Sequence, residues 1–169
     1  MNIFKNLQRP MSRLLPAVFA LAGAAHAADA ERLTHDQSQS VAAGVVACAA
    51  GKDLRIAVAI VDDRLSMFAY RRMDDVREGA AQFAIDKAHS AAAWHWPTEN
   101  NQKAVERGET AFVMSAPHMA NLGGGLPIFT KAGALIGGVG VSGSPSKQDI
   151  ACAEAGIKSA GLLHAAPEE

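Results

Sequence analysis

The chain has 169 residues, a length that predicts one domain. Its 16 basic and 17 acidic side chains give a formal net charge of −1, which lacks the basic excess of nucleic-acid-binding proteins. Hydrophobic residues make up 49% of the chain, too many for intrinsic disorder, and two cysteines are too few for a disulfide-built scaffold or a four-thiolate zinc site. No apolar run is long enough for a membrane-spanning helix, so we expect no membrane insertion of the folded domain. Because the charge is nearly balanced, we expect no nucleic-acid partner either.

Residues 1–27 are typical of a secretory signal peptide. The apolar run from 14 to 22 follows a basic leading region that contains Lys5, Arg9 and Arg13. Ala25-His26-Ala27 fits the small-x-small rule for cleavage. The sequence therefore predicts a signal peptide over residues 1–27 and a single mature domain over residues 28–169.

The signal peptide predicts a periplasmic or secreted protein, although a start at Met11, cleavage after Ala30 and an uncleaved anchor stay open. Cleavage after residue 27 removes three basic residues and no acidic one, which leaves a net charge of −4. In an oxidising compartment two cysteines about a hundred residues apart often pair, so we expect a disulfide between Cys48 and Cys152. The alternative is two buried free thiols that pack as small hydrophobes.

The hydrophobic pattern of the mature chain predicts the order helix, hairpin, helices, hairpin, helix. The expected residues are 34–50 (helix), 56–61 and 66–71 (hairpin), 80–94 and 99–107 (helices), 112–114 (a short strand), 126–129 and 135–141 (hairpin) and 146–160 (helix). Hairpins imply an antiparallel sheet, and amphipathic helices must cover it. The predicted fold class is therefore α/β in the α+β sense, an antiparallel β-sheet flanked by helices.

Polar residues mark several of the predicted element ends. Thr34 and Gln37 have the spacing of a capping box at the start of the first helix. Thr98 and Ser144 are expected to cap the helices that follow them. The acidic pair at 62–63 is interpreted as turn chemistry between the first two strands.

The segment from Gly138 to Gly143 matches the G-x-G-x-x-G dinucleotide fingerprint. The fingerprint belongs to a strand–helix–strand unit, but only one helix and a short tail follow here, so we reject dinucleotide binding. We interpret the small residues instead as the place where a helix or a neighbouring subunit lies close to the strand.

An ordered set of short motifs over roughly residues 33–162 resembles the GlcG/HbpS family, the haem-degrading-domain group that includes the C-terminal domain of PduO-type proteins. The motifs are Val58-Ala59-Ile60-Val61-Asp62, Arg72-Met73-Asp74, Lys87-Ala88, Gly124-Gly125-Leu126-Pro127-Ile128 and Ile136-Gly137-Gly138-Val139-Gly140-Val141-Ser142-Gly143. The resemblance implies a profilin-like fold and a homo-oligomer. It also implies haem binding, which some members combine with haem breakdown or extracellular haem sensing.

A haem site needs an axial donor, an apolar slot and cations near the propionates. The candidate donors are His89, His95, Met114, His118 and Met119, and the candidate cations are Lys87, Arg71 and Arg72. Gly124 and Gly125 form a loop where backbone could approach a flat ligand. His89 stands where the family often has a small residue or Thr. Because His89 and His95 are six residues apart, they lie on different faces of a helix and do not suit a mononuclear metal site.

The sequence thus predicts an exported haem- or tetrapyrrole-binding protein of the GlcG/HbpS type. One alternative is an enzyme that degrades haem or acts on another small ligand in the same pocket. Another is a ligand-free accessory subunit of a periplasmic redox or sensor system, with a membrane sensor or redox protein as its partner.

Overall fold

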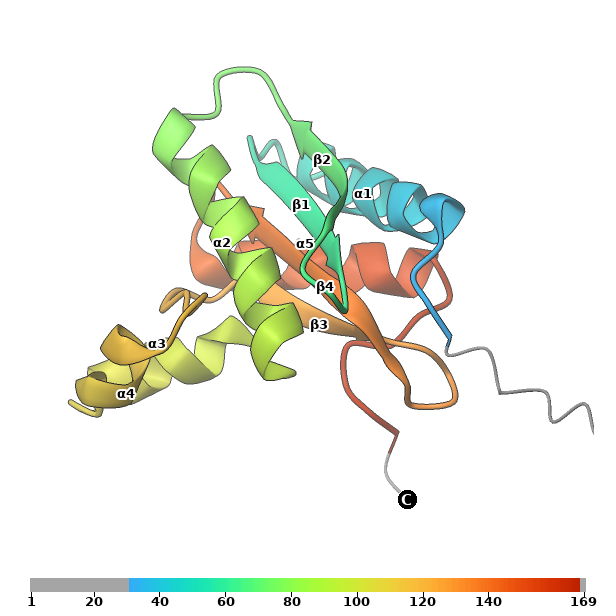
Figure 1. Ribbon diagram of the computed structural model, residues 1–169. Coiled ribbons are helices and arrows are strands. Elements are labelled where there is room, and N and C mark those ends of the chain that lie inside the picture. Colours follow the sequence, from blue (N-terminus) through green and yellow to red (C-terminus); the bar gives the residue numbers. More distant parts are fainter. Residues whose placement is uncertain (1–30, 168–169) are drawn as a thin grey trace, which may run out of the picture.

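The computed structural model describes residues 31–167, so the predicted signal peptide lies outside the described residues. The elements in chain order are α1 (His35–Ala50), β1 (Ala57–Asp62), β2 (Met67–Arg72), α2 (Glu78–Trp94), α3 (Thr98–Glu106), α4 (Thr110–Ser115), β3 (Gly125–Phe129), β4 (Leu135–Ser142) and α5 (Ser146–Ser159) (Figure 1). Within this part of the chain, no helix is long and apolar enough to cross a membrane.

The four strands form one antiparallel sheet in the order β2-β1-β4-β3. Helices α1 and α5 cover one face of the sheet, and α2 crosses the other face (Figure 1). This arrangement confirms the predicted fold class, an antiparallel sheet flanked by helices. Asp62 also has its predicted role in the first hairpin turn, because its Oδ1 accepts hydrogen bonds from the amides of Arg64 and Ser66.

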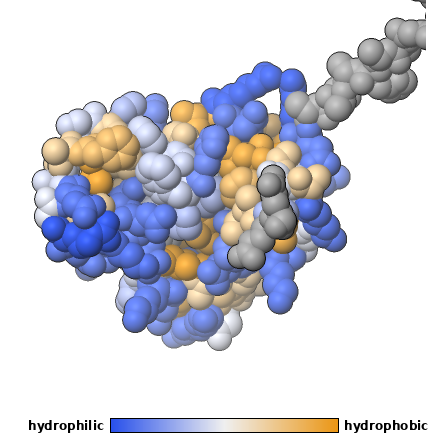
Figure 2. Space-filling view, turned by 90° about the horizontal axis from the view of Figure 1, so that it is seen from below, coloured by the Kyte–Doolittle hydropathy of each residue, from blue (hydrophilic) through white to orange (hydrophobic). Residues whose placement is uncertain are grey.

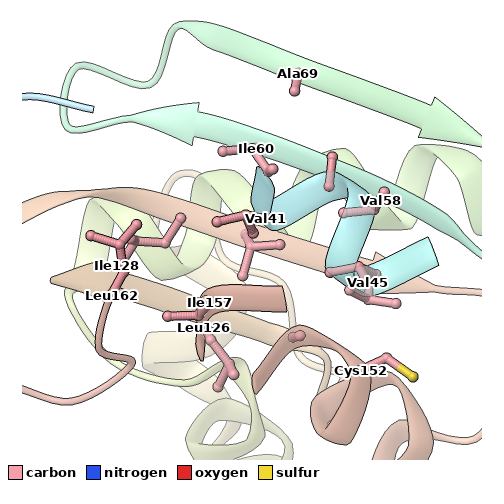
Figure 3. Packing of buried hydrophobic residues seen from close by; sticks show 14 of the residues in the cluster. Val41, Val45, Val58, Ile60, Ala69, Leu126, Ile128, Cys152, Ile157 and Leu162 are labelled. Atoms are coloured by element: carbon pink, nitrogen blue, oxygen red, sulfur yellow. The ribbon is translucent and has the colours of Figure 1, made fainter. Parts of the chain in front are cut away.

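Strand β1 is buried on both faces, and its alternate residues enter two different cores. Val58 and Ile60 point toward α1 and α5, where they pack with large aliphatic side chains such as Val41 and Ile157 (Figure 3). Ala57 and Ala59 point to the other face, where the alanines of α2 lie against them. One core is therefore bulky and the other is built from small residues.

Helix α2 lies very close to β4 because β4 presents glycine at the contact. A Cβ at Gly140 would lie 2.0 Å from the carbonyl oxygen of Ala84, and one at Gly138 would lie 2.6 Å from that of Ala88. The interpretation of the glycine-rich motif as a close helix–strand contact is confirmed. In the described chain only α5 and a tail follow β4, as the rejection of a dinucleotide site assumed.

Helices α1 and α5 cross where both carry glycine. A Cβ at Gly44 would lie 2.9 Å from the Cα of Gly156, so the two backbones touch. Cys48 and Cys152 form a disulfide between these helices, with 5.3 Å between their Cα atoms, as predicted. At the start of α1, the predicted capping box is also confirmed, because Thr34 and Gln37 exchange both bonds.

The expected strand at 112–114 is wrong, because these residues lie in α4. The short apolar run Phe112-Val113-Met114 belongs to this helix, in which Val113 is buried and Phe112 and Met114 are exposed. Phe112 packs edge-on against Trp94 with ring centroids 5.1 Å apart, and Trp96 lies 5.5 Å from Trp94, so both tryptophans pack within the protein. Figure 2 shows hydrophobic colouring on the lobe that α3 and α4 form at the left, and Phe112 and Met114 are exposed there.

Two expected helix caps are also wrong. Thr98 is the first residue of α3, and its buried hydroxyl instead donates to the Leu122 carbonyl and accepts from the Gly125 amide. The residue before α5 is Pro145, and Ser144 donates its amide and hydroxyl to Asp149. In both cases a contact with a distant or later residue replaces the local capping bond.

Candidate functional site

A pocket of about 160 Å³ lies beside α2, where the segment after α4 crosses the helix. The residues that line it are Phe83, Asp86, His89, His118, Met119, Ala120 and Asn121. The first three lie on α2, where Asp86 is three residues from both Phe83 and His89 and so neighbours each of them on the helix surface. The structure thus brings together three of the predicted haem donors, His89, His118 and Met119, which the sequence separates by about thirty residues.

His89 is partly buried, and its ring is fixed by the backbone. Its Nε2 lies 3.2 Å from the carbonyl oxygen of Leu65, in the turn between β1 and β2. A carbonyl oxygen only accepts, so Nε2 donates this hydrogen bond, and the tautomer that fits it has its lone pair on Nδ1. A backbone carbonyl that fixes the tautomer in this way is a common support for a metal-ligating histidine.

His118 faces His89 across the pocket. Their ring centroids are 5.7 Å apart and their planes are inclined by 60°. His118 has a φ of 53°, a left-handed conformation in which histidine is enriched among non-glycine residues. Its ring is exposed and makes no hydrogen bond with the residues that the structure describes. The imidazole is therefore available to a ligand.

The segment that carries His118 is held at both ends by α2 and α3. The indole of Trp94 donates to the Pro117 carbonyl at 3.1 Å, and the buried amide of Asn101 donates to the Ala120 carbonyl at 2.8 Å. Sequence reasoning missed these positioning residues, and it also missed Phe83 as a wall of the pocket. The steps of three residues from Phe83 to Asp86 and from Asp86 to His89 on the predicted helix were the signal that could have identified Phe83.

Several other predicted site residues lie away from this pocket. His95 is exposed at the C-terminal end of α2, in a left-handed conformation that turns the chain out of the helix. Arg72 bonds the Val76 carbonyl and pairs with Glu78, near the opposite end of α2. Arg71 on β2 donates to Gln39, and Met114 is exposed on α4. None of these side chains lines the pocket.

Lys87 is buried, so its ammonium is not placed to meet a ligand carboxylate at the surface. Its Nζ lies 3.3 Å from Asp149 Oδ2 and donates to the Val141 carbonyl at 3.0 Å. The pair connects α2 with α5, which lie on opposite faces of the sheet (Figure 1). Burial lowers the pKa of Lys87 and raises the pKa of Asp149, and in each case the charge of the partner opposes the shift.

The predicted glycine loop packs over this buried pair rather than lining the histidine pocket. Gly124 has a φ of 123°, and a Cβ there would lie 2.9 Å from Lys87 Nζ and 2.5 Å from the Val141 carbonyl oxygen. A Cβ at Gly125 would lie 2.5 Å from the Lys87 carbonyl oxygen. The close approach that these glycines permit is thus made by the protein's own lysine.

The fold and the pocket define a small α+β domain with its candidate binding side chains on the α2 side of the sheet. The family described as "Haem degrading protein HbpS-like" matches residues 33–158. Protein GlcG of Escherichia coli K12 is 36% identical over 109 residues, which cover 62% of this chain and 80% of GlcG. The chain therefore belongs to the HbpS-like family.

Solved structures of similar proteins agree with the fold. The crystal structure of HbpS has a TM-score of 0.68 and 29% identity, and the match covers 76% of this chain and 89% of that one. The crystal structure of the PduOC:heme complex has a TM-score of 0.73 and 24% identity, and it covers 80% of this chain and 99% of that one. At this identity the PduOC complex supports the shared fold alone.

Proposed function

We propose that this protein binds haem at the pocket beside α2. The observation that carries the proposal is the convergence of His89, His118 and Met119 on one pocket. Imidazole and thioether are the side-chain donors that haem iron accepts most readily. His89, His118 and Met119 would hold the group, and haem would supply an iron centre to the site. Membership of the HbpS-like family supports the same ligand.

The donor chemistry fits haem, whereas the pocket covers only part of such a ligand. Its volume of about 160 Å³ is below the 300–1,000 Å³ typical of small-molecule sites. Haem would therefore need apolar surface beyond the pocket. Phe83 is 41% exposed and offers such a surface. The role of the protein is to hold the iron through histidine and to cover one part of the ring.

The proposal is tested by titrating haemin into the purified chain that begins at Ala28 and recording the visible spectrum. A saturable Soret band with a stoichiometry of one haem per chain is expected. Free haemin spectra throughout the titration would overturn haem binding. Ascorbate and peroxide are then added to the complex, because the family description refers to haem degradation. A defined tetrapyrrole product with turnover would make the protein an enzyme as well as a haem-binding protein.

We also propose that the protein is exported by the segment at 1–27. The basic start, the apolar run and the Ala-x-Ala site support this, and so does the disulfide between Cys48 and Cys152, since such bonds persist in oxidising compartments. Expression of the full chain in a bacterial host is expected to give a periplasmic product whose intact mass matches the chain from Ala28 onward. A cytoplasmic product that retains residue 1 would contradict export.

We further propose that copies of the chain associate through β2. This strand is an edge of the sheet, and Met67, Phe68 and Tyr70 on it are exposed. The opposite edge is partly covered, because Phe129 of β3 pairs with Leu163. Unpaired strand edges with apolar side chains favour association. Light scattering after size exclusion is expected to give a multiple of the chain mass, and Tyr70→Lys is expected to lower this measured mass. A parent that is monomeric at high micromolar concentration would contradict association.

A further inference from the structure

A second and larger cleft lies at the opposite end of α2 from His95. Its volume is about 670 Å³, and its walls come from Arg55 just before β1, the end of the β2–α2 loop, the first two turns of α2, and the end of β4 with the turn that follows it. Arg55, Arg77, Asp75, Phe83 and Ser142 are the side chains that matter for its chemistry. The histidine pocket does not use this cleft, although Phe83 lines both.

The cleft exists because the close contact between α2 and β4 ends here. Gly138 and Gly140 let the helix touch the strand, and the next residue on that face of β4 is Ser142. Helix α2 begins only at Glu78, so little helix remains to cover Ser142. The sequence thus changes from glycine to serine at the place where the two elements separate.

Ser142 places a polar group against this space. The residue is 7% exposed, and its hydroxyl makes no hydrogen bond with any residue that the structure describes. Every fully enclosed side-chain polar atom in the described chain has a partner, so the Ser142 hydroxyl must reach the open space of the cleft. Buried hydroxyls normally have a partner, and this one has only the contents of the cleft to bond.

Two guanidinium groups supply positive charge to the same walls. Arg77 forms no ion pair with the described residues, because the adjacent carboxylate of Glu78 is taken by Arg72. Arg55 pairs with Asp53 at 3.2 Å, but both side chains are exposed, so this pairing is weak. Asp75 is the acidic group among the lining residues, which leaves one net positive charge.

Backbone amides at the start of α2 add further hydrogen-bond donors to the cleft. Arg77 is the N-cap residue of α2 and gives the helix no side-chain cap. The amides at the start of α2, including those of Gly79 and Ala80 in the wall of the cleft, are therefore left for an anion. The helix end supports the site that the arginines and Ser142 already define.

We propose that this cleft binds an organic carboxylate. Planar guanidinium groups bond carboxylates in a bidentate manner, and the Ser142 hydroxyl can donate to the same oxygens. Asp75 opposes the higher charge of phosphate, while Phe83 and Val76 provide an apolar wall for a carbon skeleton. The carboxylate has two chemical sources, a free small acid or the propionate side chains of a tetrapyrrole. Only the second source rests on the haem function proposed above.

The test is calorimetric titration with succinate at low ionic strength, alongside inorganic phosphate. Succinate is expected to bind more tightly than phosphate. Arg77→Gln and Ser142→Ala are each expected to weaken succinate binding about tenfold or more, the usual effect of losing a hydrogen bond to a charged group. Arg64→Gln is the matched control, because Arg64 lies in the β1–β2 turn at the other end of β1. Arg55→Gln replaces any variant whose thermal unfolding differs from that of the parent.

A second titration compares haemin with haemin dimethyl ester, which lacks the propionate charges. If haemin binds more tightly than the ester and Arg77→Gln removes the difference, the cleft binds propionates. If succinate binds and the two haemins do not differ, the cleft binds a free acid. The proposal is overturned if succinate fails to bind and haemin and its ester bind alike. It is also overturned if the succinate binding or the preference for haemin that the parent shows is unchanged in both Arg77→Gln and Ser142→Ala. A Soret band with the ester reports on the histidine pocket alone.

Discussion

Lys87 and Asp149 show how a single pair of residues connects the two faces of the sheet. Their charges are almost completely removed from water, and each has a partner with opposite charge. Asp149 also accepts from the amide and hydroxyl of Ser144, so it fixes the turn that leads into α5. A buried pair of this kind costs much desolvation energy, but breaking it leaves one charge without a partner.

We predict that Lys87→Met lowers the free energy of unfolding by about 3–5 kcal/mol, the usual cost of breaking a buried ion pair. Lys87→Met/Asp149→Asn is expected to recover at least half of this loss, because no buried charge then remains and the amide oxygen can still accept from Ser144. Urea unfolding of the parent and both variants measures the difference. Equal stability of the single variant and the parent would contradict the structural role of the pair.

The same pair predicts how stability depends on pH. Burial raises the pKa of Asp149 above its ordinary value, and Lys87→Met removes the charge that opposes this shift. Folded Asp149 then binds a proton over a pH range in which the unfolded chain does not, so stability falls as pH rises through the folded pKa. The loss of unfolding free energy in Lys87→Met, relative to the parent, is therefore expected to be smaller at acidic pH than at pH 7. Urea unfolding at both pH values measures this difference, and a loss of stability that grows on acidification would contradict the role given to Asp149.

At the scale of elements, the contact between α2 and β4 positions both the pocket and the cleft. We predict that Gly140→Ala lowers the free energy of unfolding by about 1–3 kcal/mol, because its Cβ would meet the Ala84 carbonyl oxygen at 2.0 Å. Gly79→Ala is the matched control, since a Cβ at Gly79 meets nothing within 4 Å. Thermal unfolding measures both, and equal effects of the two substitutions would argue against a tight helix–strand contact.

The disulfide ties the other helical layer together, since α1 and α5 are 104 residues apart along the chain at the two cysteines. The chain-entropy model assigns a stabilisation of about 4–5 kcal/mol to a loop of this length. We therefore predict that dithiothreitol lowers the thermal midpoint of the parent to that of Cys48→Ser/Cys152→Ser. The double variant is expected not to respond to the reductant. A parent that carries two free thiols by mass would remove the basis of this prediction.

Elements with a clear local signal could be predicted from the sequence, and those defined by distant contacts could not. The capping box at Thr34 and the glycines of β4 are local patterns, and the structure contains both features. Thr98 has the local pattern of a cap, but its hydroxyl bonds Leu122 and Gly125 far along the chain. Residues 112–114 form a short apolar run that fits a strand, but in the described chain they lie in α4 and outside the four-stranded sheet.

At the scale of the whole molecule, the sheet separates a structural side from a side that carries the candidate sites. Helices α1 and α5 enclose the bulky core and the disulfide on one face. The histidine pocket and the carboxylate cleft lie along α2 on the other face. The sequence predicted His89 and His118 as candidate donors because imidazole is a rare and recognisable donor, and the structure brings both to one pocket. Lys87 was predicted to meet a ligand because its buried partner, Asp149, lies 62 residues further along the chain and leaves no local signal in the sequence.

The central claim is that His89 and His118 form the haem site, and the spectra of matched histidine variants test it most directly. His118→Asn and His95→Asn change the same residue type at two exposed left-handed positions, one in the pocket and one outside it. On titration with haemin, we predict that His89→Ala and His118→Asn shift or weaken the Soret band, whereas His95→Asn keeps the parent spectrum and affinity. Parent-like spectra for both pocket variants, or a change in His95→Asn alone, would contradict the assignment.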